Sequence, residues 1–181
     1  MEMGLVEARR LAAPPLLRRP SSMEFVWSPW RYDYMASVGK KTTSCVFCVG
    51  EDTSRDADRL IVHRGAHNFV ILNLFPYTSG HFMVAPYAHI ARFDEALPEQ
   101  VTEMMVLAQR GIRALSGLYH PEGFNMGMNL GHCAGAGIRE HFHLHVVPRW
   151  IGDANFLSVI GETRVLPEEL AVTQRRISEV F

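Results

Sequence analysis

The chain has 181 residues, 48% of them hydrophobic and 20% charged, which is enough to bury the core of one globular domain. Its net charge of −1 excludes the strong positive field of proteins that bind nucleic acids or acidic membranes non-specifically. No apolar run reaches the roughly 18 residues of a membrane-spanning helix. We therefore expect a protein that has neither a membrane nor a nucleic acid as its partner.

Three cysteines are an odd and sparse set, typical of a reducing compartment, so we expect a cytoplasmic protein. The first 23 residues combine short apolar pieces with prolines and two arginine pairs. We interpret residues 1–23 as a flexible leader, followed by a single domain at residues 24–181. A processed organelle-targeting segment is the alternative, and Glu2 and Glu7 argue against it.

After the leader, the residue pattern predicts an α+β fold. Ser28 and Pro29 fit the cap and the first turn of a short helix that reaches about residue 37. Apolar residues recur every three or four positions at 97–119, as in a helix with one buried face, and Pro167 starts a closing helix. Runs rich in β-forming residues predict five strands, at residues 60–63, 68–74, 81–86, 124–130 and 142–147. We expect about five antiparallel strands with helices packed on one side.

The last predicted strand carries a histidine at every second position, namely His141, His143 and His145. Side chains two apart in a strand share a face, and their roots lie about 6.6 Å apart. The three imidazoles can therefore converge on one phosphate, metal ion or water. A solvated strand face more often carries Lys, Glu or Thr, so we interpret this row as a functional site rather than a fortuitous run of histidines.

Cys45 and Cys48 have the spacing of a zinc-ligand pair. A pair by itself also fits two reduced core cysteines or a redox pair, although the strand-helix context of a thioredoxin-like motif is missing. Cys133 stands alone and is predicted to be a small buried residue, and the neighbouring His132 is predicted to be exposed.

The segment His141-Phe-His143-Leu-His145-Val-Val resembles the signature of the histidine triad (HIT) superfamily. Asn73, followed by Gly80-His81, is similar to the nucleotide-binding hairpin of that family. The segments at 148–156 and 161–167 look most like bacterial diadenosine tetraphosphate phosphorylases and hydrolases of the fragile-histidine-triad-like branch. The resemblance covers about residues 25–181. It implies a HIT-like fold and a homodimer whose two sheets join into a ten-stranded sheet.

The resemblance implies an enzyme that cleaves diadenosine polyphosphates through a covalent nucleotidyl-histidine intermediate. His143 would be the nucleophile, because a neutral imidazole can attack a phosphorus that repels anions and can later leave. His145 would polarise the phosphate oxygens, and His141 would orient or protonate the leaving group. Contacts with the nucleotide or its phosphates are implied for Asn73, His81, Asn129, Gly135, Ala136, Gly137, Ile71, Met83 and Trp150.

Several of these residues also have an ordinary structural interpretation. Asn73 can be a turn-forming residue at a strand end, and Ile71 and Met83 can be core residues. The small residues at 134–137 let the backbone approach a developing phosphorane charge closely, and they can also form an ordinary glycine-rich turn.

The resemblance further implies a structural Zn²⁺ held by Cys45, Cys48, His89 and His141. A metal-bound His141 is not free to protonate a leaving group, so these two roles of His141 exclude each other.

Other functions stay open at this level. Either phosphate or water can attack the nucleotidyl intermediate in the second step. The segment at 148–156 favours phosphate as the attacking group. A purine nucleoside phosphoramidase, or a nucleotide sensor with weak catalysis, is the alternative. A three-histidine metal hydrolase would lose activity to chelators and form no covalent adduct. Sugar-phosphate uridylyl transfer is disfavoured because that branch carries Gln where this chain has His145.

Overall fold

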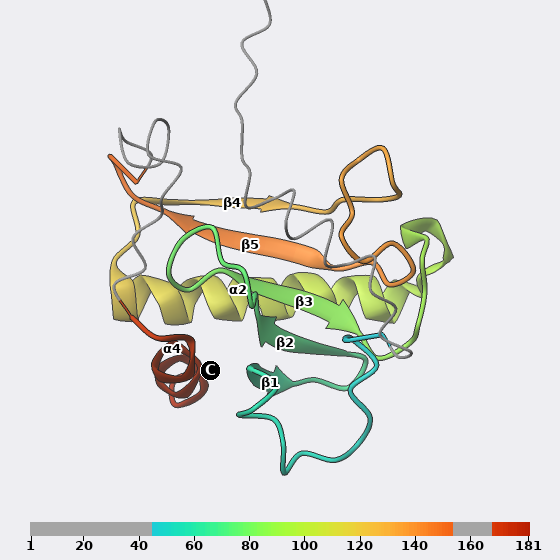
Figure 1. Ribbon diagram of the computed structural model, residues 1–181, viewed down its shortest axis with the longest axis horizontal. Coiled ribbons are helices and arrows are strands. Elements are labelled where there is room, and N and C mark those ends of the chain that lie inside the picture. Colours follow the sequence, from blue (N-terminus) through green and yellow to red (C-terminus); the bar gives the residue numbers. More distant parts are fainter. Residues whose placement is uncertain (1–44, 154–167) are drawn as a thin grey trace, which may run out of the picture.

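The computed structural model describes residues 45–153 and 168–181, where five strands form one antiparallel sheet in the order β1-β2-β3-β5-β4 (Figure 1). The strands are β1 (Ile61–Arg64), β2 (Asn68–Leu72), β3 (Phe82–Pro86), β4 (Gly123–Gly127) and β5 (Leu144–Arg149). The helices are α2 (Pro98–Tyr119), α4 (Leu170–Ser178) and a short 3₁₀ helix, η1 (Phe93–Glu95). No helix in the described ranges is long and apolar enough to cross a membrane.

The sheet is buried on both faces along its central strands. On one face, α2 lies behind the sheet in the view of Figure 1, and its apolar stripe packs on alternate residues of β2, β3 and β5. Ile177 of α4 joins this core beside α2. The opposite face carries a second cluster, formed by Phe47, Val49, Ile61, Phe69, Ile71, Met83 and Ala85. The predicted α+β architecture, with five antiparallel strands and helices on one side, is confirmed.

The predicted element bounds differ from the observed ones mainly around the last hairpin. β4 ends at Gly127 rather than at residue 130, and β5 begins at Leu144 rather than at residue 142. The pairing of β4 with β5 starts at Gly127 and His145. Residues 128–143, which connect the two strands, lie outside the sheet, and the backbone is left-handed at Gly131 and Gly135. The predicted leader and the predicted helix at about 28–37 lie outside the described residues.

Helix α2 approaches the sheet closely at Gly111. A Cβ atom at this position would lie 2.3 Å from the Phe82 ring. We therefore expect Gly111→Ala to lower the free energy of unfolding by about 1–3 kcal/mol, because either α2 or the ring must move. Gly117→Ala is the matched control on the same helix, where a Cβ meets nothing within 4 Å, and it should raise stability by up to about 1 kcal/mol. Urea unfolding measures both, and equal effects would contradict a close approach at Gly111.

Candidate active site

The three histidines lie on the face of the sheet that α2 leaves open. His145 is in β5, where it pairs in register with Met83 of β3 on one side and Gly127 of β4 on the other. His141 and His143 come just before β5, and the ring centres of His143 and His145 are 4.8 Å apart. The core beneath α2 holds the side chains between them, Phe142, Leu144 and Val146. The row of imidazoles expected from the alternation is thus present on one face.

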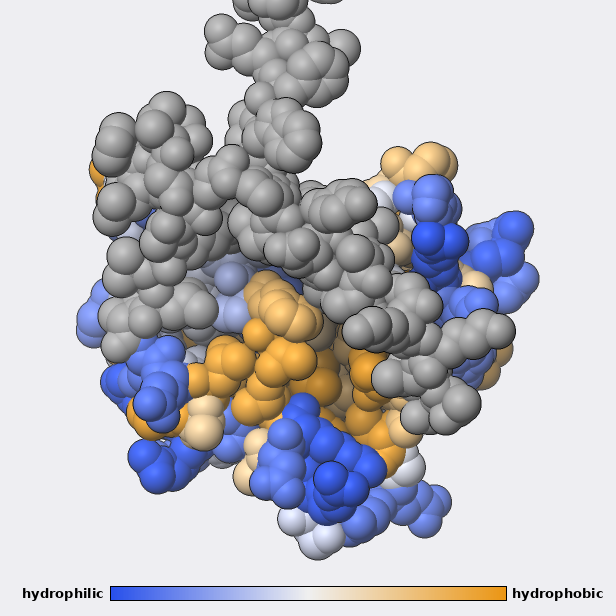
Figure 2. All heavy atoms as spheres, in the orientation of Figure 1, coloured by the Kyte–Doolittle hydropathy of each residue, from blue (hydrophilic) through white to orange (hydrophobic). Residues whose placement is uncertain are grey.

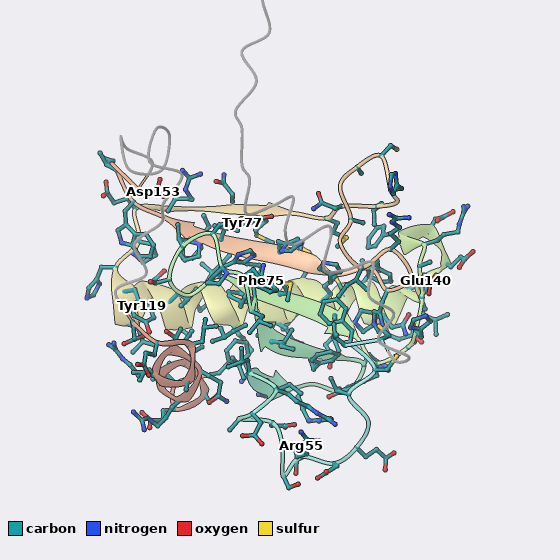
Figure 3. All side chains as sticks on the ribbon, in the orientation of Figure 1. Arg55, Phe75, Tyr77, Tyr119, Glu140 and Asp153 are labelled. Atoms are coloured by element: carbon teal, nitrogen blue, oxygen red, sulfur yellow. The ribbon has the colours of Figure 1, made fainter. Side chains whose placement is uncertain are left out.

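Apolar residues form the floor beside this row. Ile71 and Met83 are cross-strand partners on the open face, and both are buried in the second cluster. Figure 2 shows hydrophobic side chains gathered in the middle of this face, with hydrophilic residues around them. Phe75 and Tyr77, from the loop between β2 and β3, lie in front of β3 and β5 in Figure 3. An apolar floor next to a few convergent polar groups is the common composition of a small-molecule site.

His143 is held as a neutral imidazole with a free Nε2. Its Nδ1 lies 3.0 Å from the main-chain oxygen of His141. A carbonyl oxygen can only accept, so Nδ1 carries the proton and Nε2 keeps its lone pair. Burial lowers the pKa of His143, because the charged form would lose its hydration. The side chain therefore has the protonation state that a nitrogen nucleophile needs near neutral pH.

His145 has the opposite tautomer, which a chain of hydrogen bonds imposes. The main-chain N–H of Tyr77 donates to Nδ1 of His81 at 3.1 Å, so the proton of His81 is on Nε2. That Nε2–H donates to Nδ1 of His145 at 3.0 Å, which leaves the His145 proton on Nε2. Burial first, and then the neighbouring His143, lower the pKa of His145 to about 4. His145 is thus a neutral hydrogen-bond donor whose ring lies next to that of His143.

Asn73 closes the turn that carries this chain of hydrogen bonds. Its Oδ1 accepts the main-chain N–H of Phe75 at 3.0 Å, which is the turn-forming role. Its Nδ2 lies 3.4 Å from Nδ1 of His81. Asn73 is therefore linked to His145 through one intervening residue, His81, and lies next to the triad.

Cys45, Cys48, His89 and His141 form a cluster that could hold a metal ion. One ligand atom from each lies within 4.8 Å of every other. Sγ of Cys45 is 3.5 Å from Nδ1 of His141, and Sγ of Cys48 is 3.4 Å from Nδ1 of His89. Around a tetrahedral zinc ion with sulfur at about 2.3 Å and nitrogen at about 2.0 Å, neighbouring S and N ligands lie about 3.5 Å apart. The four residues are therefore a donor set that zinc prefers, and the two sulfur–nitrogen distances match a tetrahedral site.

His141 is oriented toward this cluster. Its Nε2 donates to the main-chain oxygen of Pro86 at 2.8 Å, which leaves the lone pair on Nδ1, the atom facing Cys45. The main-chain N–H of Phe142 donates to the oxygen of Ile90 at 2.9 Å, and this contact holds the segment after β3 beside the triad. Both ring nitrogens of His141 are thus engaged, so the geometry favours the metal-ligand role over protonation of a leaving group.

The loop before the triad is closed on itself. The N–H of Gly135 donates to the oxygen of His132 at 3.0 Å, and that of Ala136 donates to the oxygen of Gly131 at 3.3 Å. Contacts from these two amides to a phosphate would have to replace those bonds. Gly137 and Asn129 belong to the same connection between β4 and β5, and both are half-buried.

Two further residues of the sequence analysis, Trp150 and Cys133, lie in the segments that flank the triad. The Trp150 indole donates to the main-chain oxygen of Tyr119 at 3.3 Å, at the end of α2. It follows His145 by five residues, which is about 16 Å along a strand, and its predicted contact with the nucleotide stays a prediction. The prediction that Cys133 is buried is wrong, because the closed loop holds it at the surface, as it does the exposed His132.

Phe47 was not among the predicted site residues, yet it contacts two of the histidines. It is 1% exposed, and its ring centre is 4.7 Å from that of His143 and 5.4 Å from that of His141. The sequence feature that indicates Phe47 is its position between Cys45 and Cys48, because a large apolar residue inside a pair of metal ligands must pack beside the site.

Comparison with known proteins defines the family. The family model described as HIT domain matches residues 54–150, more than half of the chain. The AP-4-A phosphorylase of Mycobacterium tuberculosis is 37% identical over 162 residues, which cover 86% of this chain and 83% of that protein. This chain therefore belongs to the HIT family.

Solved structures agree with this assignment. A Zn-bound histidine triad family protein from Mycobacterium smegmatis superposes with a TM-score of 0.59 at 29% identity, covering 77% of this chain and 94% of that one. The diadenosine triphosphate hydrolase of Plasmodium falciparum, in complex with cyclomarin A, gives a TM-score of 0.56 at 14% identity over 83% of this chain and 92% of that one. The second likeness concerns the fold alone.

The depressed pKa of His145 predicts that acid destabilises the fold. Below its ordinary pKa of about 6.5, the unfolded chain takes up a proton at His145, whereas the folded chain does so only near pH 4. Stability is therefore lost as pH falls through this window, by about 2 kcal/mol between pH 7 and pH 5 from this residue. Urea unfolding of the wild type and of His145→Asn at both pH values tests this. The same pH dependence in both proteins would contradict a depressed pKa at His145.

Proposed function

We propose that this protein cleaves diadenosine tetraphosphate by phosphorolysis, through a nucleotidyl intermediate on His143. The observation that carries the proposal is the pair of opposite tautomers in two rings whose centres are 4.8 Å apart, with a lone pair on Nε2 of His143 and a proton on Nε2 of His145. One nitrogen can attack a phosphorus, and the other can donate to its oxygens. The 37% identical relative, named as an AP-4-A phosphorylase, supports the substrate and the reaction.

In the first step, Nε2 of His143 attacks the α-phosphorus, and the bond from this phosphorus to the bridging oxygen breaks, releasing ATP. In the second step, an oxygen of inorganic phosphate attacks the same phosphorus, the P–N bond breaks, and ADP leaves with His143 neutral again. His145 donates its Nε2 proton as a hydrogen bond to the phosphate oxygens in both steps, while Ile71 and Met83 offer an apolar surface to an adenine ring.

The position of His141 supports a phosphoanhydride over a phosphoramidate substrate. Its ring nitrogens are directed to Pro86 and to Cys45, so neither is placed to protonate a leaving group. A departing phosphate chain is stable as an anion, since the second pKa of a phosphate monoester is about 6. A departing amine needs a proton. The alternative, a purine nucleoside phosphoramidase, therefore lacks an evident acid among the three histidines.

Zinc at Cys45, Cys48, His89 and His141 would have a structural role, fixing the segments that carry these residues. The histidine triad protein of Mycobacterium smegmatis, which is Zn-bound, supports this choice of metal. The free thiols of the three cysteines support a cytoplasmic location.

A homodimer is proposed at the β4 edge of the sheet. β4 is the last strand in the order, and its residues Asn125, Met126 and Gly127 are exposed. Pairing with β4 of a second copy would satisfy this edge and make a ten-stranded sheet. Light scattering tests it, because a monomeric mass at micromolar concentration would exclude this pairing.

The reaction is tested by incubating the protein with diadenosine tetraphosphate and ³²P-labelled inorganic phosphate, and separating the nucleotides. Phosphorolysis gives unlabelled ATP and ADP labelled at its β-phosphate. Hydrolysis through the same intermediate gives ATP and AMP, with or without phosphate. Binding without any product would support the nucleotide-sensor alternative and overturn the proposed activity. An adenosine phosphoramidate, supplied in a parallel reaction, tests the phosphoramidase alternative.

A further inference from the structure

The turn that carries the two metal-binding cysteines also carries a residue that packs on the nucleophile. The N–H of Cys48 donates to the oxygen of Cys45 at 3.1 Å, and that of Val49 donates to the oxygen of Phe47 at 3.0 Å. These bonds make a compact turn with Phe47 near its middle. The thiols of the turn face His141 and His89. Between them, the Phe47 side chain enters the interior and reaches His143.

The contact between Phe47 and His143 supplies a restraint that hydrogen bonding does not. The bond from Nδ1 of His143 to the oxygen of His141 sets the tautomer, but an imidazole can still pivot about a single hydrogen bond. The Phe47 ring lies 4.7 Å away at an interplanar angle of 43°, and is itself backed by Phe69 at 6.5 Å. Close packing on this side limits the pivot and so directs Nε2.

We propose that Phe47 is a positioning residue that couples the metal-binding turn to His143, so that metal loading sets how well the nucleophile is aimed. The inference rests on the proposed role of His143. When a metal ion joins Cys45 and Cys48 of the turn to His89 and His141, Phe47 is held against the His143 ring. When the turn loosens, the ring regains its pivot, and attack on phosphorus slows while nucleotide binding is retained.

The test is a two-by-two comparison of wild type and Phe47→Leu, each with and without metal, in the full chain. We expect chelation of the wild type to slow formation of the adenylyl adduct about 10- to 100-fold in single-turnover quench experiments, with KM little changed. Metal-loaded Phe47→Leu should be slowed to a similar extent. Chelation should then lower the rate of adduct formation of Phe47→Leu by less than about threefold further, because the residue that couples the turn to His143 is already gone.

Matched controls separate positioning from general loss of structure. Val46→Ala changes the neighbouring residue of the same turn, which is 59% exposed, and should keep both the wild-type rate and the wild-type response to chelation. Phe47→Leu should bind one equivalent of zinc like the wild type, because Phe47 is not a ligand. A Phe47→Tyr variant, which restores the ring, should recover most of the lost rate.

A readout independent of turnover comes from ¹⁵N NMR of the His143 imidazole. The wild type with metal should show narrow signals of a ring protonated at Nδ1. Both the metal-free wild type and Phe47→Leu should keep this tautomer, because the hydrogen bond to His141 remains, but should show signals broadened by motion of the ring. Independent, multiplicative effects of chelation and Phe47→Leu on rate would overturn the proposal, as would an unchanged NMR signature. Absence of any adduct in the wild type would refute the proposed function instead, and the NMR comparison would still decide the coupling.

Discussion

Replacing His143 by Ala is expected to abolish cleavage of diadenosine tetraphosphate, lowering kcat by a factor of about 10⁴ to 10⁶. The nitrogen that we propose takes up the nucleotidyl group would be gone, and His145 cannot replace it, because its Nε2 carries a proton and its Nδ1 is occupied by His81. The apolar floor of the site is unchanged, so the equilibrium dissociation constant for the nucleotide should stay within about threefold of wild type. Steady-state kinetics and calorimetry measure the two quantities.

The matched control is His67→Ala, in the exposed turn between β1 and β2, which should keep full activity. Mass spectrometry of acid-quenched wild type should find an adenylyl group on the peptide that contains residues 141–145. Turnover by the His143 variant at the wild-type rate, or an adduct on a different residue, would refute His143 as the nucleophile.

Loss of a cluster cysteine is expected to remove the metal and a large part of the stability. Cys45→Ser should bind less than about a tenth of an equivalent of zinc, and should unfold at least about 3 kcal/mol more easily than the zinc-loaded wild type. The physical reason is that an ion bound only by the native state stabilises that state, and the ligands come from segments far apart in the chain, Cys45 and Cys48 on one side and His89 and His141 on the other.

Cys133→Ser is the matched control, since it makes the same chemical change at an exposed thiol outside the cluster. It should keep one equivalent of zinc and wild-type stability. Elemental analysis of protein purified without added zinc, together with urea unfolding, measures both variants. Wild-type protein without zinc under these conditions would contradict the metal site, as would equal stability of Cys45→Ser and Cys133→Ser.

Much of the fold and of the triad could be predicted because it depends on local periodicity. The stripe of α2 and the alternation of His141, His143 and His145 with apolar residues each follow from the repeat of one element. That repeat decides which side chains share a face. It does so here even though His141 and His143 precede β5, which begins at Leu144. Resemblance added His89, which no local pattern singles out.

Burial outside the regular elements was harder to predict. Cys133 belongs to a residue type that is usually buried, but the loop at 131–137 closes through its own main-chain bonds and leaves this side chain in solvent. No local pattern indicates that the indole of Trp150 donates to the main-chain oxygen of Tyr119, because this contact depends on how α2 crosses the sheet.

The sequence by itself determined which groups are available: three imidazoles on one face, two thiols, and an apolar strand beside them. Only the tertiary structure decided what each imidazole can do. Tautomers are set by the main-chain oxygens of Pro86 and His141 and by the relay from Tyr77 through His81, and these partners are brought to the histidines by strand pairing and loop packing. A proton on an imidazole is placed by its hydrogen-bond partner, and no sequence interval specifies which distant carbonyl or amide that partner will be.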